Sequence, residues 1–271
     1  SDWTENGFDF VRGEEAGERS RSLFAKIIGA NVDDIALIPS VSSAAGLIAS
    51  QFEKAKSGEN IIIGEREYSS NHFPWKLLGQ KGYQIRQIPF RNGGLEPEDI
   101  KASMDGGTRL VAFSAVQTAS GHRSDISSIA AIAKQNDAIT FVDGSQMAGA
   151  LPVAPYLDSI DVFSTPNHKF LLNAGRGMGY CYFHKNIQSK IIPTSAGWKA
   201  GAVPFDSFFG PDMHLSDTAS RFDNSISWLA AIGDEASLSV FDLVGIDAIY
   251  NWNAALIRYL LDKLIATRWL P

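Results

Sequence analysis

Short apolar stretches rich in β-branched and aromatic residues alternate along this chain with segments of helical periodicity. Strands are predicted at Ile35–Pro39, Asn60–Ile63, Gln84–Pro89, Leu110–Ser114, Ile139–Val142, Asp161–Ser164 and Gly179–Phe183. The segment Asp125–Lys134 places Ile126 and Ile129 on one helical face, with Asp125 as the N-cap, and another helix is predicted to begin near Ser42. Strands and helices that alternate in this way form a mostly parallel sheet flanked by helices. The sequence therefore predicts an α/β fold.

The character of the sequence changes after Ile191. Residues 194–217 are rich in Gly, Pro, Phe and Asp, which is typical of irregular loops. Two helices are predicted to follow, at Ser227–Val244 and Ile246–Thr267. We therefore divide the chain into a large domain at residues 1–245 and the beginning of a small C-terminal α/β domain at residues 246–271, and we expect segments at both termini to be absent from this sequence.

Composition and charge exclude several classes of protein. Of 271 residues, 45% are hydrophobic and 20% charged, which is typical of a globular protein with a large core. A net charge of -6 without long basic runs argues against a nucleic-acid partner, and no apolar run is long enough to span a membrane. The start at Ser1-Asp2-Trp3 lacks the pattern of a secretion signal, and Cys181, as the single cysteine, allows no internal disulfide. We expect a cytoplasmic protein.

An acidic residue follows one of the predicted strands directly. The apolar run that ends at Val142 continues into Asp143 and then Gly144. Open α/β sheets bind ligands at the carboxyl ends of their strands, so Asp143 is a candidate ligand-binding residue. The alternative is that this acid only caps a turn or a helix.

The next predicted strand leads into a lysine, in the order Thr165-Pro166-Asn167-His168-Lys169. Lysines are usually solvated, and one alternative is an ordinary surface loop. The lysine amine, however, is the side-chain group that forms an imine with an aldehyde, and partial desolvation favours its neutral, nucleophilic form. Lys169 is therefore a candidate nucleophile.

Further candidates lie at other strand ends. Ser42 and Ser43 open a helix, where free N–H groups and the helix dipole bind phosphate, although plain N-capping is equally common. Tyr68 can stack on a flat ring or be a half-buried loop residue, and Gln117 offers an amide to a ring hydroxyl. Together with the acid and the amine, these groups are what pyridoxal 5′-phosphate (PLP) requires of a protein.

The order of these motifs resembles the class V aminotransferase and cysteine desulfurase-like family of PLP-dependent enzymes, which have the aspartate-aminotransferase fold. The resemblance covers roughly residues 15–265. Its most specific part is Asp143-Gly144-x-Gln146, followed by His168-Lys169 and a Gly-x-Gly turn. It implies the large domain of a PLP-dependent transferase, a homodimer and a small amino acid as the substrate.

The resemblance also implies a role for each candidate. Lys169 would form the Schiff base with PLP and move the Cα proton, and Asp143 would pair with the ring nitrogen. Gln146, assisted by Gln117, would lie near the phenolic oxygen. Tyr68 would stack on the ring, at a position where the family often has His.

The phosphate would be held by Ser42, Ser43 and His168, with Thr165 as a weaker candidate. The family usually has a small hydroxyl residue two positions before the His, where this chain has Pro166. Part of the phosphate cradle therefore departs from the family pattern. No metal site is predicted.

These motifs predict the cofactor better than the reaction. Cysteine desulfurases of this family use a nucleophilic cysteine on a later loop, whereas Cys181 lies within an apolar strand and is predicted to be a packed core residue. We predict an enzyme that acts at the Cα of a small amino acid, as an aminotransferase or a C–S lyase. The alternatives are an amino-acid epimerase of the same family, or a catalytically degenerate member with a binding or regulatory role. A dehydrogenase is disfavoured because no G-x-G-x-x-G follows an early strand.

Overall fold

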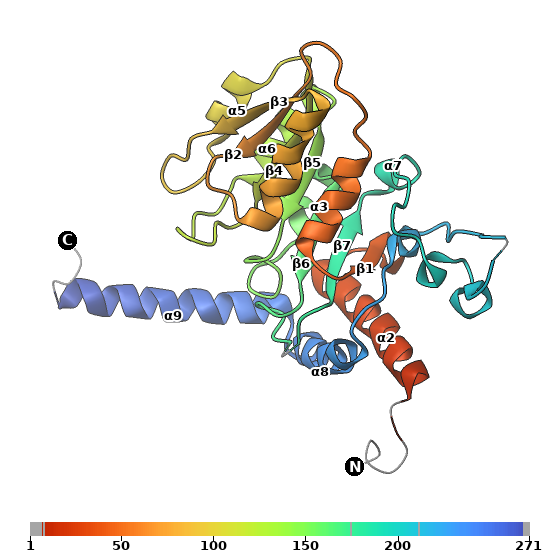
Figure 1. Cartoon of the computed structure of the whole chain (residues 1–271). Coiled ribbons are helices and arrows are strands. Elements are labelled where there is room, and N and C mark those ends of the chain that lie inside the picture. The colour runs from red at the N-terminus through yellow and green to blue at the C-terminus, as the bar shows by residue number, and fades with distance from the viewer. Residues whose placement is uncertain (1–6, 8, 174, 211, 268–271) are drawn as a thin grey trace.

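The structure is a computed structural model of the 271-residue chain, and it describes residues 7, 9–173, 175–210 and 212–267 (Figure 1). The sequence features discussed at Ser1-Asp2-Trp3 and in the last residues up to Pro271 lie outside the described residues. The division into domains at residue 245 stays a prediction.

One seven-stranded sheet, formed by described residues, occupies the centre of the molecule, with its strands in the order β1-β7-β6-β5-β4-β2-β3. The strands are β1 (Ile35–Ile38), β2 (Asn60–Gly64), β3 (Gln84–Ile88), β4 (Thr108–Ser114), β5 (Ile139–Asp143), β6 (Val162–Pro166) and β7 (Gly179–Phe183). Neighbouring strands pair in parallel, except that β7 is antiparallel to both β1 and β6. The predicted α/β fold with a mostly parallel sheet is confirmed.

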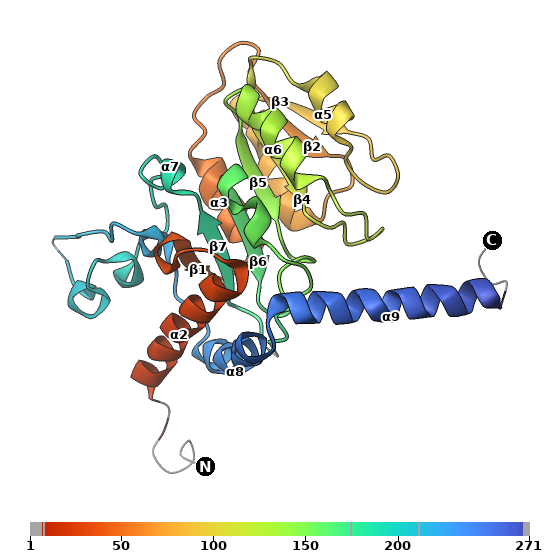
Figure 2. The same cartoon turned by 180° about the vertical axis from the view of Figure 1, so that it is seen from behind.

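Helices cover both faces of this sheet, as the two opposite views in Figures 1 and 2 show. The helices in the described part of the chain are α2 (Phe10–Ile28), α3 (Val41–Ser50), α4 (Phe73–Lys76), α5 (Pro97–Ser103), α6 (Ile126–Gln135), α7 (Lys185–Gln188), α8 (Trp228–Val244) and, projecting away from the sheet, α9 (Ile246–Ala266). The N-cap predicted for α6 is confirmed, since the Asp125 side chain accepts a hydrogen bond from the Ser128 N–H (3.0 Å). Helix α3 begins before the predicted residue, because Ser40 is its N-cap and accepts from the Ser43 N–H (3.2 Å).

Most strands are short apolar runs because both faces of the sheet are buried, whereas the edge strand β3 contains polar residues and is partly exposed. In β2, Ile61 and Ile63 pack in the core with α3 and α4, whereas Ile62 packs in the core with α2, α5, α6 and α8. All three side chains are fully buried, and each such burial stabilises the fold by about 1.5–3 kcal/mol. Two separate cores therefore hold the sheet rigid.

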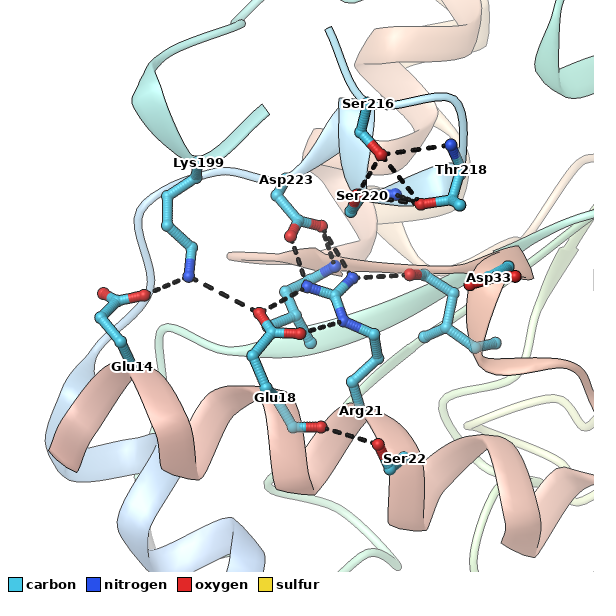
Figure 3. A network of polar contacts seen from close by, with 12 residues as sticks. Glu14, Glu18, Arg21, Ser22, Asp33, Lys199, Ser216, Thr218, Ser220 and Asp223 are labelled. Atoms are coloured by element: carbon cyan, nitrogen blue, oxygen red, sulfur yellow. Dashed lines mark hydrogen bonds and ion pairs between the residues drawn. The ribbon is translucent and has the colours of Figure 1, made fainter. Parts of the chain in front are cut away.

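A buried ionic network fastens the irregular segment 198–223 to α2 and β1 (Figure 3). Arg21, on α2, donates to both carboxylate oxygens of Asp223 (3.1 and 2.5 Å), and Asp223 also accepts from the Leu37 N–H (2.7 Å). Lys199, which is also buried, forms an ion pair with Glu14. Asp223 therefore points into the protein, where it holds the loop against the sheet.

Helix α9 leaves the body of the molecule directly after Gly245 and extends away from the sheet (Figures 1 and 2). None of its residues, all of which the structure describes, is buried, and the Trp252 side chain is 67% exposed. Among the helices in the described part of the chain, none is long and apolar enough to cross a membrane.

Candidate active site

Four parallel strands bring the sequence-predicted residues to one edge of the sheet. Because β2, β4, β5 and β6 run in the same direction, the segments that follow them start at the same edge. Tyr68 follows β2, Gln117 follows β4, Asp143 ends β5 and Lys169 follows β6. Residues from distant parts of the sequence therefore face a common region, where such sheets bind ligands.

Asp143 is a buried carboxyl beside a cation. It is only 3% exposed, and its carboxylate accepts a hydrogen bond from the Ser145 N–H (2.9 Å). Burial raises the pKa of Asp143, while the hydrogen bonds of Ser145 and the positive charge of Lys169 act in the opposite direction. The Lys169 ammonium is thus near enough to stabilise the ionised carboxylate, and a second cation bound here would do the same.

Lys169 is half-buried, and its amine is directed at an aromatic ring. Its Nζ lies 5.9 Å from the centroid of the Tyr68 ring, a distance typical of a cation–π contact. The Tyr68 side chain itself is 53% exposed, so one side of this ring is open to a ligand. The amine therefore faces an aromatic ring and is near enough to the Asp143 carboxylate for its charge to act on it.

Gln117 is held by a carboxyl that the sequence analysis overlooked. Its Nε2 donates to Oε1 of Glu67 (2.7 Å), and both residues are buried. Glu67 also accepts from the N–H (3.1 Å) and the hydroxyl (2.5 Å) of Ser114. Burial raises the pKa of Glu67 to about 7, and the charge of Asp143 adds to the increase. The only sequence feature that could have identified Glu67 is its position as an acid beside Tyr68, shortly after an apolar strand.

Gln146 reaches the same region from the segment after β5. It is half-buried, and its Nε2 donates to the Thr118 hydroxyl (3.1 Å) in the segment after β4. The two glutamines thus have different partners, Glu67 for Gln117 and Thr118 for Gln146. Both amides are oriented by hydrogen bonds before any ligand arrives.

The two predicted phosphate serines lie in the first turn of α3. Because Ser40 caps the helix, neither Ser42 nor Ser43 is needed for that purpose, and both hydroxyls lie 2.9 Å from the Ser40 hydroxyl. Ser42 lines a cavity of about 610 Å³ together with Ser69 and Ser70, which follow Tyr68. The start of α3 and the segment that carries Tyr68 therefore line the same cavity.

His168 and Thr165 differ in whether their side chains are available to bind a ligand. Burial lowers the pKa of His168, and the nearby positive charges of Arg176 and Lys169 lower it further, so the neutral imidazole is favoured. Its Nδ1 is buried and has no hydrogen-bond partner among the described residues. Thr165 is fully buried in β6, where its hydroxyl donates to the Pro166 carbonyl (3.2 Å). The structure does not bring Thr165 to the surface of the site.

The residues gathered here fit the cofactor predicted from the sequence. A pyridine nitrogen needs a buried acid, which Asp143 offers, and an aldehyde needs an amine, which Lys169 offers close by. The unpartnered Nδ1 of His168 is a free polar atom for a ligand. In the part of the chain that the structure describes, no three His, Cys, Asp or Glu side chains gather to hold a metal ion.

Cys181 lies apart from this site, within β7. It is fully buried, and burial raises the pKa of its thiol well above the ordinary range. A reactive cysteine needs the opposite, an exposed thiol with a lowered pKa. The prediction that Cys181 is a packed core residue is confirmed.

Known proteins share both the sequence pattern and the fold. The family model described as aminotransferase class-V matches residues 11–268. An uncharacterized aminotransferase, YcbU, of Bacillus subtilis is 25% identical over 244 residues, which cover 90% of this chain and 63% of that protein. A cysteine desulfurase of Dickeya dadantii is 28% identical over 260 residues, which cover 94% of this chain and 62% of the relative.

Solved structures agree with the fold. A cysteine desulfurase from Thermococcus onnurineus NA1 superposes with a TM-score of 0.77 at 23% identity, over 94% of this chain and 63% of that one. The cystine C–S lyase C-DES, solved with its product cysteine persulfide, has a TM-score of 0.79 at 19% identity, over 92% and 68% of the two chains. The chain spans about three fifths of the length of the curated relatives it matches. By the match over residues 11–268, it belongs to the aminotransferase class-V family.

Proposed function

We propose that this protein binds PLP at the carboxyl edge of its sheet and acts at the Cα of a small amino acid, as an aminotransferase or a C–S lyase. One observation carries the proposal: the half-buried amine of Lys169 faces the Tyr68 ring, and its positive charge opposes the rise in pKa that burial causes in Asp143. Membership of the aminotransferase class-V family supports it, as do relatives named as cysteine desulfurases and a structural neighbour named as a C–S lyase.

Each residue has one task in this proposal. PLP, when bound, supplies an electron-withdrawing ring that weakens the bonds at Cα. Asp143 would hold the proton on the ring nitrogen, and Lys169 would bond the cofactor and afterwards carry the Cα proton. Tyr68 would stack on the ring and exclude water from it. Gln117 and Gln146 would orient the phenolic oxygen.

We assign the binding of the cofactor phosphate to hydroxyl and imidazole groups. Ser42 and Ser43, at the start of α3, would donate to the phosphate together with backbone N–H groups of that helix turn. His168, favoured in its neutral form, would donate from one ring nitrogen. Thr165, with its hydroxyl engaged inside β6, has no part in this assignment.

The buried thiol bears on the choice of reaction. Cysteine desulfurase chemistry passes sulfur to a protein cysteine, and Cys181, which is buried in β7, does not offer its thiol for that step. Amino-group transfer and C–S bond cleavage need no such thiol. We include a homodimer and a cytoplasmic location in the proposal. Phe73 and Leu77, about 60% exposed beside Ser42, form an apolar surface of the kind that oligomers bury.

A panel of amino acids tests the reaction. The protein loaded with PLP is incubated with cysteine, cystine, alanine and serine, each with an oxo-acid acceptor. Pyruvate with sulfide from cysteine, or with cysteine persulfide from cystine, indicates C–S cleavage, and an oxo acid with a newly aminated acceptor indicates transfer. Incorporation of solvent deuterium at Cα with inverted configuration, and no other product, would replace the proposal by an epimerase. If the protein bound no PLP at all, the proposed function would be wrong.

The Glu67 carboxyl gives the site a titration near neutral pH. Its folded-state pKa of about 7 lies above the ordinary value of 4.5, so the folded state favours the protonated form. This stabilisation is complete below about pH 4.5 and is lost as the pH rises through 7. We expect Glu67→Gln to remove a transition near pH 7 from the absorbance of the PLP-loaded protein.

The same substitution changes stability with a definite sign. One pKa unit is worth about 1.4 kcal/mol, so ionised Glu67 costs the fold up to about 3 kcal/mol above neutral pH. Glu67→Gln is therefore expected to melt at a higher temperature than the wild type at pH 8 but not at pH 5. Glu65→Gln, an exposed neighbour, serves as the control. An unchanged absorbance titration in Glu67→Gln would contradict the assignment.

A further inference from the structure

A cavity of about 240 Å³ lies beside α3, where residues 193–196 and 221–224 meet that helix. Lys169, Tyr68 and Asp143 do not line it. Among the lining residues, all of which the structure describes, a single arginine carries a charge. The polar residues of the lining are Ser43, Thr194, Ser195, Arg221 and Asn224.

The guanidinium of Arg221 has no counter-ion among the described residues. Its Nε is buried and has no hydrogen-bond partner there, and none of the ion pairs that these residues form includes it. Its Cζ lies 5.9 Å from the centroid of the Phe222 ring, at the limit of a cation–π contact. A cation withdrawn from water costs free energy unless it is paired. The cavity therefore contains a cation that an anionic ligand would stabilise.

Hydrogen bonds hold the walls of the cavity in place. Gln51, which ends α3, accepts from the Ile192 N–H (2.8 Å) and donates to the Ile192 carbonyl (3.0 Å). The Asn224 side chain donates to the Ser195 carbonyl (3.3 Å), and the Asn224 N–H donates to the Leu37 carbonyl on β1 (3.1 Å). The segment that carries Ser195 is thus fastened to α3 at one end and to the neighbour of β1 at the other.

The backbone that carries the guanidinium is fixed as well. Phe222, the next residue, is 4% exposed, and its ring centroid lies 4.5 Å from that of Phe183 on β7. The Arg221 N–H donates to the Thr218 carbonyl (3.1 Å). Because both the walls and this backbone are already ordered, a ligand would bind at a small cost in conformational entropy.

The lining of the cavity defines the chemistry of its ligand. A guanidinium presents parallel N–H donors that match a carboxylate. Ser43 lies in the first turn of α3, where the positive end of the helix dipole also favours an anion. Ile38 and Leu47 add apolar surface. Pockets for drug-sized molecules span about 300–1,000 Å³, so this cavity suits a smaller ligand. One positive charge beside an apolar wall fits a monocarboxylate better than a phosphate dianion.

We propose that this cavity binds a small organic monocarboxylate, whose carboxylate pairs with Arg221 and whose carbon chain contacts the apolar wall. The proposal does not depend on the function proposed for Lys169. Ser43, however, is shared with the phosphate site assigned above, so binding has to be measured both without and with PLP.

Titration with propionate tests the proposal. Propionate has neither a carbonyl nor an amine, so it cannot bond Lys169 or PLP. It is added to the full chain, and NMR follows the Arg221 Nε–H signal, identified by its absence in Arg221→Gln, together with the backbone amides of Thr194 and Ser195. Neutral 1-propanol and inorganic phosphate are titrated in parallel. Arg66→Gln, which changes an arginine whose side chain is 80% exposed, is the control variant.

We expect propionate, but not propanol, to shift these signals in the wild type, with or without PLP, and to shift the two amides equally in Arg66→Gln. Arg221→Gln should bind propionate at least about tenfold more weakly, because a charge-assisted pair is lost. Without ligand, Arg221→Gln should melt no lower than the wild type, since the change removes a cation that lacks a partner. Propionate should raise the melting temperature of the wild type but not of this variant.

No shift in the wild type, or equal affinity in Arg221→Gln, would overturn the proposal. Phosphate binding that depends on Arg221, without propionate binding, would show that the ligand class is wrong. If PLP abolished the propionate shifts, the cavity would belong to the cofactor site and not to a separate one. If Arg221→Gln does not fold, Arg221→Lys, which keeps the charge but loses the planar donors, replaces it, and unchanged affinity there would contradict the pairing. A protein that binds propionate but no PLP would disprove only the proposed function.

Discussion

We expect replacement of Lys169 by alanine to abolish the absorbance band that the protein develops with PLP, and to lower turnover at least about a thousandfold. The reason is chemical, because no other side chain near Asp143 supplies a primary amine among the described residues. Absorbance spectra of the wild type and the variant, each incubated with PLP and then with borohydride, measure the effect. Mass spectrometry of the reduced wild type should place the added mass on the peptide that contains residue 169.

A second substitution distinguishes the covalent bond that Lys169 forms with PLP from the effect of its positive charge. Lys169→Arg keeps a positive charge beside Asp143 but cannot bond the cofactor in the same way. It is expected to bind PLP reversibly, without a borohydride-stable adduct. Lys185→Ala, at an exposed lysine, is the matched control and should behave as the wild type. A reduced adduct that persists in Lys169→Ala would mean that another amine bonds the cofactor.

The largest loss of stability is expected from Asp223→Ala. This change leaves the guanidinium of Arg21, which is 4% exposed, with only the exposed carboxylate of Glu18 as an ionic partner, and it leaves the Leu37 N–H without its acceptor. Breaking a buried ion pair from one side costs about 3–5 kcal/mol, which is roughly 10 °C in melting temperature for a chain of this size. Thermal melts followed by circular dichroism at pH 7 measure this loss.

Two comparisons identify the cause of that loss. Asp99→Ala removes the partner of Arg91 in an exposed ion pair and should leave the melting temperature almost unchanged. The double variant Arg21→Met with Asp223→Leu removes both charges, and it should recover much of the stability that Asp223→Ala loses. If the double variant were less stable than Asp223→Ala, the loss of the buried partner of Arg21 would not be the cause.

Much of the fold is determined by local patterns in the sequence. The predicted strands agree with the observed ones within one or two residues, because buried parallel strands require short apolar runs and helices require their own period. The N-cap at Asp125 and the burial of Cys181 were also predicted, the first from its place before a helical pattern and the second from its apolar neighbours. Such properties depend on neighbours in the chain.

Other features depend on which strands are neighbours in space. Glu67 reaches Ser114 and Gln117 because β2 lies beside β4, and the order of strands cannot be read from the chain. The inward direction of Asp223 likewise depends on Arg21, which is 202 positions away in the sequence.

The sequence by itself determined the fold class, the positions of the strands, and the acid and amine that follow two of them. Only the tertiary structure decided that Glu67 and Asp234 are buried carboxyls with raised pKa values, and that Thr165 is turned into its strand. The physical reason is that burial and electrostatic environment are set by contacts between distant segments. Local periodicity carries no information about those contacts.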